Sequence, residues 1–316
     1  MNRGGTVFLH ADDFGMNTAI TDGIVTGFTH GLLTSASILA NAPGFADAVR
    51  RWKWLEQERA AGRLSSAGGR GALGDNGEYP FDLGVHLNLT EGRPLTPGFP
   101  AEFLDATGRF PGIASALRRL TLHAGRLRVP VLQELSAQVE RVMDAGLRPA
   151  HLNGHHYVEL IPQLAEPIMA LALRFQIPAV RAARERHLWL ALRNHPAPAT
   201  NTCLAFVKAG LAHRLRRRLC NHLVSADAFC GTAHAGRMSL DLLQRSIRRM
   251  RPGSTLEVGL HPGHAPDTTG GRPIAGHWRD PLEDLRPAEL TMVRSSQLVD
   301  LFASAGVRLG RIASMS

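Results

Sequence analysis

Two adjacent acids, Asp12 and Asp13, are the first residues in the chain whose types and spacing suggest chemistry. They lie in the segment HADDFG and directly follow a short apolar run at residues 6–9, which is typical of a buried strand. Neighbouring carboxylates repel each other, and burial of either one is unfavourable unless a cation or a shared proton compensates its charge. The pair therefore predicts a cationic or proton-sharing partner at the end of this strand.

Histidines follow three later apolar runs. His86 lies in GVHLNLTEG, His155 in HLNGHHYVE and His261 in VGLHPGH, and the same segments contain His151, His156 and His264. If these runs are parallel strands of a β/α barrel, their carboxyl ends converge on one face, where active sites are built. We therefore expect the histidines to lie close to the acid pair.

One carboxylate and two imidazoles suit a divalent ion such as zinc and leave coordination positions open for water and substrate. Such an ion would neutralise one aspartate, so that the other could stay ionised as a base. Taken singly, the acid pair could instead cap a helix or turn, His86 could be a hydrogen-bonded core residue, and the HPG segment at 261–263 could be a turn. Their joint occurrence at successive strand ends favours a shared metal site.

The elements that must position these residues alternate between short strands and longer helices. Apolar or β-branched runs predict strands at 7–9, 36–39, 83–87, 150–152, 179–181, 223–226, 256–260 and 307–309. Helical periodicity predicts helices at 18–29, 45–58, 132–145, 163–175, 239–250 and 288–305. This alternation indicates a single α/β domain with a parallel sheet, and a distorted (β/α) TIM-like barrel is the natural form at 316 residues.

Two segments fall outside this alternation. Residues 59–80 are rich in Gly, Ser and Ala and predict a flexible surface insertion. Residues 204–219 predict a basic amphipathic helix, with apolar side chains at helical spacing at Leu204, Val207, Leu211, Leu215 and Leu219, and basic ones at Lys208, Arg214, Arg216, Arg217 and Arg218. This helix could lie at a membrane surface, or it could pack on the protein with a solvated arginine face.

The composition is that of an ordinary globular protein, with 44% hydrophobic and 20% charged residues. No apolar stretch approaches the roughly 18 residues of a membrane span. The strand pattern begins too early to leave room for a signal peptide, so a cytoplasmic location is expected. Three cysteines without C-x-x-C spacing suggest neither a disulfide framework nor a thiolate zinc site.

The formal net charge of +9 is a weak guide to binding partners. Among 36 lysines and arginines only Lys53 and Lys208 are lysines, so a bias toward arginine explains much of the excess. Aromatic residues make up only 6% of the chain, and neither a helix-turn-helix nor a zinc-finger pattern is present. These features argue against nucleic acid as a partner.

The motifs resemble those of the YdjC-like carbohydrate deacetylase family. The matching segments are HADDFGMN, GLLTSASILANAPGFADAV, LGVHLNLTEGRPL, PAHLNGHHYVELIPQL and EVGLHPGH, in an order that covers most of residues 1–316. The resemblance implies a distorted β/α barrel that removes acetyl groups from N-acetylated sugars with one divalent metal ion. By the same resemblance, Asp13, His86 and His155 would be the metal ligands, Asp12 the general base and His261 the second catalytic group. Zinc is favoured by the ligand types, and magnesium or another divalent ion stays open.

A further segment, DAFCGTAHAGRMS, is similar to the HpnK subgroup associated with hopanoid biosynthesis. That resemblance implies deacetylation of an N-acetylglucosaminyl hopanoid to a free glucosamine headgroup. The basic helix and the apolar segment HLWLAL at 187–192 favour such a glycolipid and a peripheral contact with the inner membrane. The alternatives are a deacetylase of soluble chitooligosaccharides or another N-acetylated sugar, and a metal-binding scaffold without turnover. The oligomeric state is left open.

The chain departs from the family pattern H-x-D-x-H-H-H-V-H, which runs across its fourth predicted strand. Asn153 replaces the acid, Tyr157 replaces a histidine and Glu159 replaces the last histidine. Asn153 would have to orient an imidazole through its amide oxygen. Tyr157 and Glu159 would alter contacts with the substrate rather than the metal site.

Overall fold

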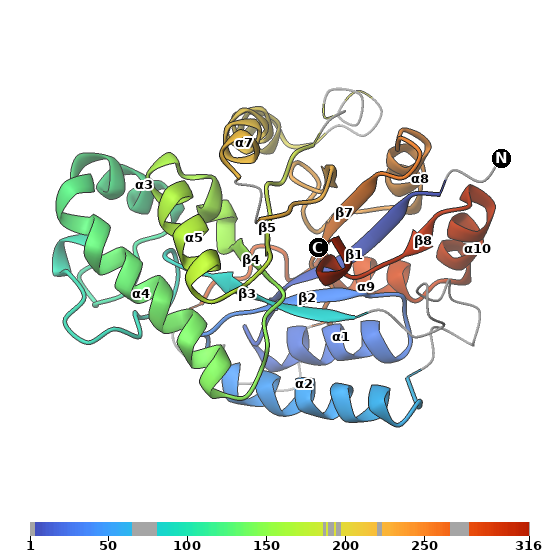
Figure 1. The fold of residues 1–316 in the computed structure, drawn as a ribbon, viewed down its shortest axis with the longest axis horizontal. Helices are drawn as coiled ribbons and strands as arrows, with labels where there is room; N and C mark the ends of the chain where they lie inside the picture. The colour runs from blue at the N-terminus through green and yellow to red at the C-terminus, as the bar shows by residue number, and fades with distance from the viewer. Residues whose placement is uncertain are drawn as a thin grey trace.

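The computed structural model describes residues 4–64, 81–185, 188, 193, 197–219, 223–265 and 278–315. Within them, parallel strands form one curved sheet surrounded by helices (Figure 1). The strands are β1 (Thr6–Phe14), β2 (Ser35–Ile38), β3 (Asp82–Leu87), β4 (His151–Gly154), β5 (Ala179–Val180), β6 (Ala228–Cys230), β7 (Thr255–Leu260) and β8 (Arg308–Leu309). The predicted parallel α/β architecture is confirmed.

Helices follow most of the strands. The α-helices are α1 (Thr18–Thr29), α2 (Phe45–Ala60), α3 (Ile113–Leu122), α4 (Ala124–Asp144), α5 (Pro162–Arg174), α7 (Ala199–Arg218), α8 (Leu240–Arg248), α9 (Arg286–Val293) and α10 (Ser296–Ala305). Short 3-10 turns occur at η2 (Ala101–Phe103), η3 (His155–Leu160) and η4 (Ile312–Met315). Helices α1 and α2 cover one side of the sheet, where Trp52 packs edge-on against Phe14 and Phe28 (Figure 1).

The sheet has the strand order β5-β4-β3-β2-β1-β7-β6, and β8 pairs with the start of β1. Its two edges approach each other, because Val180 N donates to Val224 O at 3.0 Å and Val224 N donates to Pro178 O at 2.9 Å. The sheet is therefore a distorted barrel, as predicted. Since the strands are parallel, the carboxyl ends of β1, β3, β4 and β7 lie along the same rim.

The strand predicted at 223–226 is wrong in position. Only Val224 pairs there, as an isolated bridge to Ala179 of β5, and the regular strand β6 begins at Ala228 beside β7. The chain changes partner strand between these two points. Asp227 marks the change, because its carboxylate accepts hydrogen bonds from the backbone N–H and the hydroxyl of Thr255 at the start of β7.

Two helix predictions have wrong boundaries. The helix predicted at 288–305 is two helices, because Ser295 caps α10 by accepting a hydrogen bond from Leu298 N. The helix predicted at 132–145 begins eight residues earlier, at Ala124. Its first half contains Pro130, which lacks the N–H of an internal helical residue but does not end the helix here.

The two irregular segments fit their predictions only in part. Helix α2 extends to Ala60, so residues 59 and 60 are helical rather than part of an insertion, and residues 65–80 lie outside the described residues. Helix α7 confirms the predicted helix, yet its apolar side chains do not form one buried face. Leu204 and Val207 are 54% and 60% exposed, whereas the smaller Ala205 and Ala212 are fully buried. No helix among the described residues has the length and apolar character to span a membrane.

Candidate metal centre and acid pair

The end of β1 directs both aspartates into one buried cluster. Adjacent side chains of a regular strand point to opposite faces. Here the pairing of β1 with β2 shifts register between Ala11 and Phe14, and Asp13 adopts a left-handed backbone with φ of 69°. Both aspartates are buried, and their carboxylates face the same histidine, His86.

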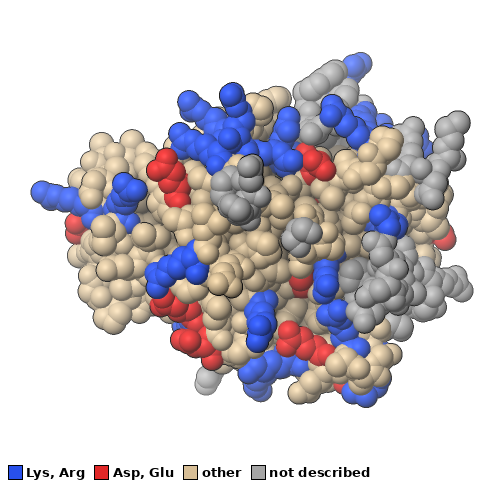
Figure 2. Space-filling model, in the orientation of Figure 1, with Lys and Arg blue, Asp and Glu red and all other residues tan. Residues whose placement is uncertain are grey.

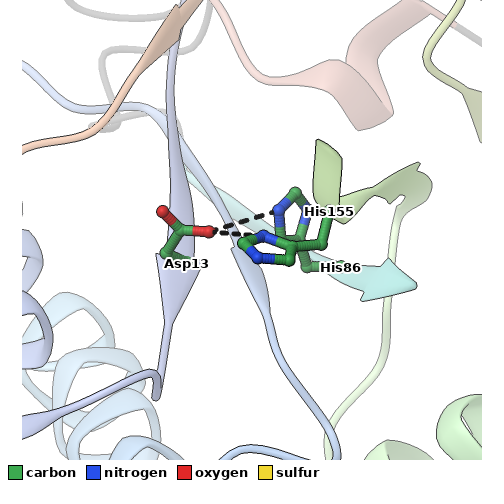
Figure 3. Close-up of side chains that lie close together, drawn as sticks. All are labelled: Asp13, His86 and His155. Atoms are coloured by element: carbon green, nitrogen blue, oxygen red, sulfur yellow. Dashed lines mark ion pairs between the residues drawn. The ribbon is translucent and has the colours of Figure 1, made fainter. Parts of the chain in front are cut away.

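Asp13, His86 and His155 lie together, as predicted (Figure 3). Asp13 Oδ1 is 3.4 Å from His86 Nε2 and 3.0 Å from His155 Nδ1. His86 comes from β3, and His155 opens η3 directly after β4. One carboxylate oxygen and two imidazole nitrogens, all buried and within 4.8 Å of one another, form a donor set that fits a divalent metal ion.

A buried arginine also compensates Asp13, which the sequence analysis did not anticipate. Arg286, the first residue of α9, donates from Nη2 to Asp13 Oδ2 at 2.8 Å and is itself held by Asp280 through Nε at 2.7 Å. Burial alone would raise the pKa of Asp13, but Arg286 and the two histidines hold that pKa well below its usual range. Asp13 is therefore ionised and leaves Oδ1 facing the histidines.

Asp12 has a separate set of partners. Arg181 donates from Nη1 to Asp12 Oδ2 at 2.8 Å and from Nε to Glu257 at 2.7 Å. On the other carboxylate oxygen, His10 Nε2 lies 3.1 Å from Asp12 Oδ1. Burial opposes ionisation, yet the charge of Arg181 holds the pKa of Asp12 well below its usual range. The cation that compensates Asp12 is thus supplied by the protein itself.

Asn153 contacts the acid pair rather than an imidazole. Its amide Nδ2 donates to Asp12 Oδ1 at 2.8 Å, and its amide oxygen has no hydrogen-bond partner among the described residues. The expectation that the oxygen would orient a histidine is therefore wrong. An amide is more favourable than an ionised acid at position 153, because the amide N–H donates a hydrogen bond to the Asp12 carboxylate, whereas a second carboxylate would repel it.

His261 lies beside Asp12, at the end of β7. Its Nε2 is 3.8 Å from Asp12 Oδ2, and its backbone N–H donates to Glu289 at 2.6 Å. Burial lowers the pKa of His261 to about 4, so the imidazole is neutral near pH 7. Its Nδ1 has no hydrogen-bond partner among the described residues.

The remaining histidines of the predicted segments have other surroundings. His151 points into the barrel interior, with its ring edge-on to His10 at 4.8 Å between centroids. His156 contacts the Thr90 hydroxyl at 2.9 Å, and His264 contacts Thr26 at the surface at 3.2 Å. None of these three belongs to the Asp13 cluster, although His156 belongs to a second group with Glu91 and His155.

The two other departures from the family pattern, Tyr157 and Glu159, lie within η3, which contacts α7. Tyr157 packs edge-on against Phe229, with 6.3 Å between ring centroids, and Lys208 of α7 places its ammonium 4.2 Å from the Tyr157 ring centroid. Glu159 is fully buried, and neither of its carboxylate oxygens has a hydrogen-bond partner among the described residues. Burial raises the pKa of Glu159 to about 7.

Sequence reasoning missed Arg181, Arg286, Glu257 and Glu289, which hold the acid pair and the His261 loop. A usable signal was present for Glu257, because it is a lone acid inside the apolar strand LEVGL. A buried strand tolerates such an acid only when a cation faces it. That rule could have predicted a buried arginine, but not which one.

The curved parallel sheet and the Asp–His–His cluster at its carboxyl-terminal rim define a distorted (β/α) barrel with a candidate divalent-metal centre. The chain belongs to the YdjC-like protein family, whose model matches residues 6–304.

Relatives with curated descriptions are carbohydrate deacetylases. One from Geobacillus stearothermophilus is 32% identical over 183 residues, which cover 57% of this chain and 62% of that protein. One from Mus musculus is 30% identical over 275 residues, covering 80% of this chain and 76% of that protein. The match to the Geobacillus and Brevibacillus brevis relatives spans about three fifths of their lengths, 62% and 60%.

A crystal structure from Enterococcus faecalis V583, provisionally described as a cellobiose-phosphate cleavage protein, shares the fold. It superimposes with a TM-score of 0.64 at 19% identity and covers 99% of both chains. This likeness supports the barrel architecture of the described residues.

Proposed function

We propose that this protein is a metal-dependent N-deacetylase that hydrolyses the acetamide of an N-acetylated sugar to an amine and acetate. The observation that carries the proposal is the division of the acid pair. Asp13 faces two histidines through Oδ1, the carboxylate oxygen that Arg286 does not bind, while Asp12 lies beside this cluster and has hydrogen-bond partners of its own. The curated descriptions of the relatives support the reaction class.

Asp13, His86 and His155 would hold the metal ion. Two imidazoles and one carboxylate favour zinc, since magnesium prefers an all-oxygen set. When bound there, the ion would supply Lewis-acid chemistry, which makes water a nucleophile near neutral pH and polarises the carbonyl group.

Asp12 would act as the general base that takes the proton of the attacking water. Its low pKa makes it a weak base, but it also keeps the carboxylate ionised at every working pH. Arg181 and Asn153 fix both of its oxygens, so the proton is delivered to a known position. This arrangement would contribute to catalysis through the fixed position of the Asp12 carboxylate rather than through its basicity.

His261 would carry the proton to the departing nitrogen, because an amide anion is a poor leaving group. A neutral imidazole must first receive a proton before it can donate one. Asp12 Oδ2, 3.8 Å from His261 Nε2, is placed to supply it. The two residues would thus move one proton from the water to the amine during a single turnover.

For the substrate we propose an N-acetylglucosaminyl hopanoid, presented to a cytoplasmic enzyme at the inner membrane surface. Helix α7 supports this choice. Its exposed apolar side chains at Leu204, Phe206 and Val207 lie about two to four turns before the exposed Arg214, Arg217 and Arg218. Figure 2 shows basic side chains gathered over this helix. Apolar and basic groups on one helix fit the interface of an anionic membrane.

The same helix reaches toward the metal cluster on its inner side. Lys208 covers Tyr157, which follows His155 by two residues. A lipid-linked sugar bound at the acid pair would therefore leave the barrel close to α7. The apolar segment 187–192, apart from the buried Leu188, lies outside the described residues.

The decisive experiment is to incubate the zinc-loaded protein with N-acetylglucosaminyl hopanoid and, separately, with chitobiose, and to measure acetate release. Release from the hopanoid alone supports the lipid-linked substrate. Release from chitobiose alone supports the alternative, a deacetylase of soluble chitooligosaccharides. Release from neither sugar would count against the deacetylase proposal.

A further inference from the structure

His155 uses only one of its ring nitrogens in the Asp13 cluster. Its Nδ1 lies 3.0 Å from Asp13 Oδ1, and its Nε2 points the other way, toward Glu91 Oε2 at 4.0 Å. Both of these outward atoms are buried and have no hydrogen-bond partner among the described residues. A buried polar atom without a partner is unfavourable, so this pairing calls for an explanation.

Glu91 is held in place by its backbone. Its N–H donates to Asn88 Oδ1 at 3.1 Å, and its carbonyl accepts from the amides of Asn88 and Asn41 at 2.8 and 3.0 Å. The side chain is 16% exposed, against 9% for His155. The turn after β3 thus aims a mostly buried carboxylate at the outer edge of a candidate metal ligand.

The other histidine of the cluster has the same arrangement. His86 turns Nε2 toward Asp13 at 3.4 Å, and its Nδ1 contacts the Ser37 hydroxyl at 3.2 Å. Each imidazole therefore presents one nitrogen to the cluster and the other to a polar group behind it. Histidines that bind metals are usually held in this way, which fixes their tautomer and ring orientation.

Glu91, His155 and His156 could also be read as a second group of metal ligands. The chemistry of the ring argues against this when the first site is occupied. A neutral imidazole has one free lone pair, so if Nδ1 serves the Asp13 cluster, Nε2 carries a proton and is a donor. A donor needs an acceptor, and the Glu91 carboxylate is the one that faces it.

We propose that Glu91 is a positioning residue whose carboxylate closes this 4.0 Å separation in the metal-bound protein, accepts a hydrogen bond from His155 Nε2–H and so keeps Nδ1 free for the metal ion. The inference rests on the proposed metal site. Glu91 touches neither substrate nor metal in this role. It acts by selecting one tautomer and one orientation of the ring.

The test measures zinc affinity directly, by competition with a chromophoric chelator, in the wild type, Glu91→Gln and Glu91→Leu. Loss of such an acceptor typically weakens metal binding by about 10- to 100-fold, which we expect for Glu91→Leu. Glu91→Gln should lose less, because its amide oxygen can still accept the hydrogen bond. Glu102→Gln, at an exposed position, is the matched control and should bind zinc like the wild type.

Two further measurements make the result unambiguous. Metal analysis should give one zinc per chain in the wild type, and nitrogen-15 NMR of labelled histidine should show His155 protonated at Nε2. Unchanged affinity in Glu91→Leu, whose fold is checked by circular dichroism, would overturn the proposal. Two zinc ions in the wild type and one in Glu91→Leu would overturn it in favour of a second metal site. Because none of these readouts needs turnover, they are independent of whether the protein deacetylates a sugar.

Discussion

Arg181 donates a hydrogen bond to Asp12 Oδ2 at 2.8 Å, with the guanidinium and the carboxylate both almost completely buried. The pairing explains how two adjacent acids can share one strand end. Each has its own arginine, since Arg286 stands in the same relation to Asp13. A metal ion is thus not needed to make burial of the pair tolerable, and it can be lost without leaving both charges uncompensated.

Removal of Arg181 should destabilise the fold. Arg181→Ala leaves Asp12 and Glu257 buried without their cation, which typically costs about 3–5 kcal/mol in the free energy of unfolding. Urea denaturation measures this loss. Arg50→Ala, which removes a surface ion pair, is the control and should change stability little. Equal stability of the two variants would contradict the role given to Arg181.

Asp12→Asn should keep the metal and lose turnover by several orders of magnitude, because the amide cannot take a proton from water. Metal analysis and acetate release on the same preparation separate the two effects. Near wild-type turnover in this variant would show that Asp12 is not the base. Such a result would also favour a binding scaffold over an enzyme.

Asp13→Ala, His86→Ala and His155→Ala should each lose the metal ion, because each removes one of three protein donors. Metal content after dialysis checks this. His264→Ala is the matched control, since this exposed histidine lies outside the cluster and its side chain contacts the Thr26 hydroxyl. Full occupancy in all three cluster variants would refute the ligand assignment.

Glu159 should make the protein less stable as the pH rises. Burial raises its pKa from 4.5 to about 7, so the folded chain binds this proton more tightly than the unfolded chain. The cost is absent below about pH 4.5 and complete above about pH 7, where it reaches roughly 3 kcal/mol. The charges nearby, Arg181 and Lys208, limit the cost but do not abolish it.

The measurement is urea denaturation of the wild type and Glu159→Gln at pH 5 and pH 8. The glutamine variant should gain stability over the wild type at pH 8 and much less at pH 5. Histidines titrate in both proteins, so the difference between them isolates Glu159. A constant difference across this range would exclude the predicted titration.

Replacement of the exposed apolar side chains of α7 should weaken binding to anionic vesicles. We expect the wild type to sediment with anionic liposomes and less with neutral ones, and Phe206→Ser combined with Val207→Ser to sediment less. Leu122→Ser changes a side chain on α3 that is 68% exposed, and it controls for nonspecific binding of exposed apolar side chains to the vesicles. Failure of the wild type to bind either lipid would weaken the lipid-linked substrate in favour of a soluble sugar.

The sequence predicted the barrel and the meeting of the acid pair with several histidines, because both follow from local patterns. The choice of Asp13, His86 and His155 as metal ligands came from the family resemblance. Apolar runs separated by helices predict parallel strands, and parallel strands place their carboxyl ends together. No comparable rule exists for the arginines. Arg181 is 169 residues from Asp12 and Arg286 is 273 residues from Asp13, so nothing in the spacing links either pair.

The differences from prediction at α7 and β6 have related causes. Helical periodicity predicted an apolar side that includes Leu204 and Val207, and left open whether it lies at a membrane or packs on the protein. Helix α7 packs on the protein through Ala205, Ala212 and Leu215 instead. An apolar run predicted one strand at 223–226, yet the chain divides its pairing between β5 and β7. In both places the local structure depends on the surface against which the segment packs or pairs. That surface is assembled from distant parts of the chain.

The register shift near the end of β1 has a consequence for how the chain can change. One backbone irregularity between Ala11 and Phe14 lets both adjacent acids point inward. A single-residue deletion that restored regular pairing would send one carboxylate to the opposite side of the barrel wall, among the helices. Insertions and deletions should therefore be tolerated far less in this short stretch than point substitutions at its other positions.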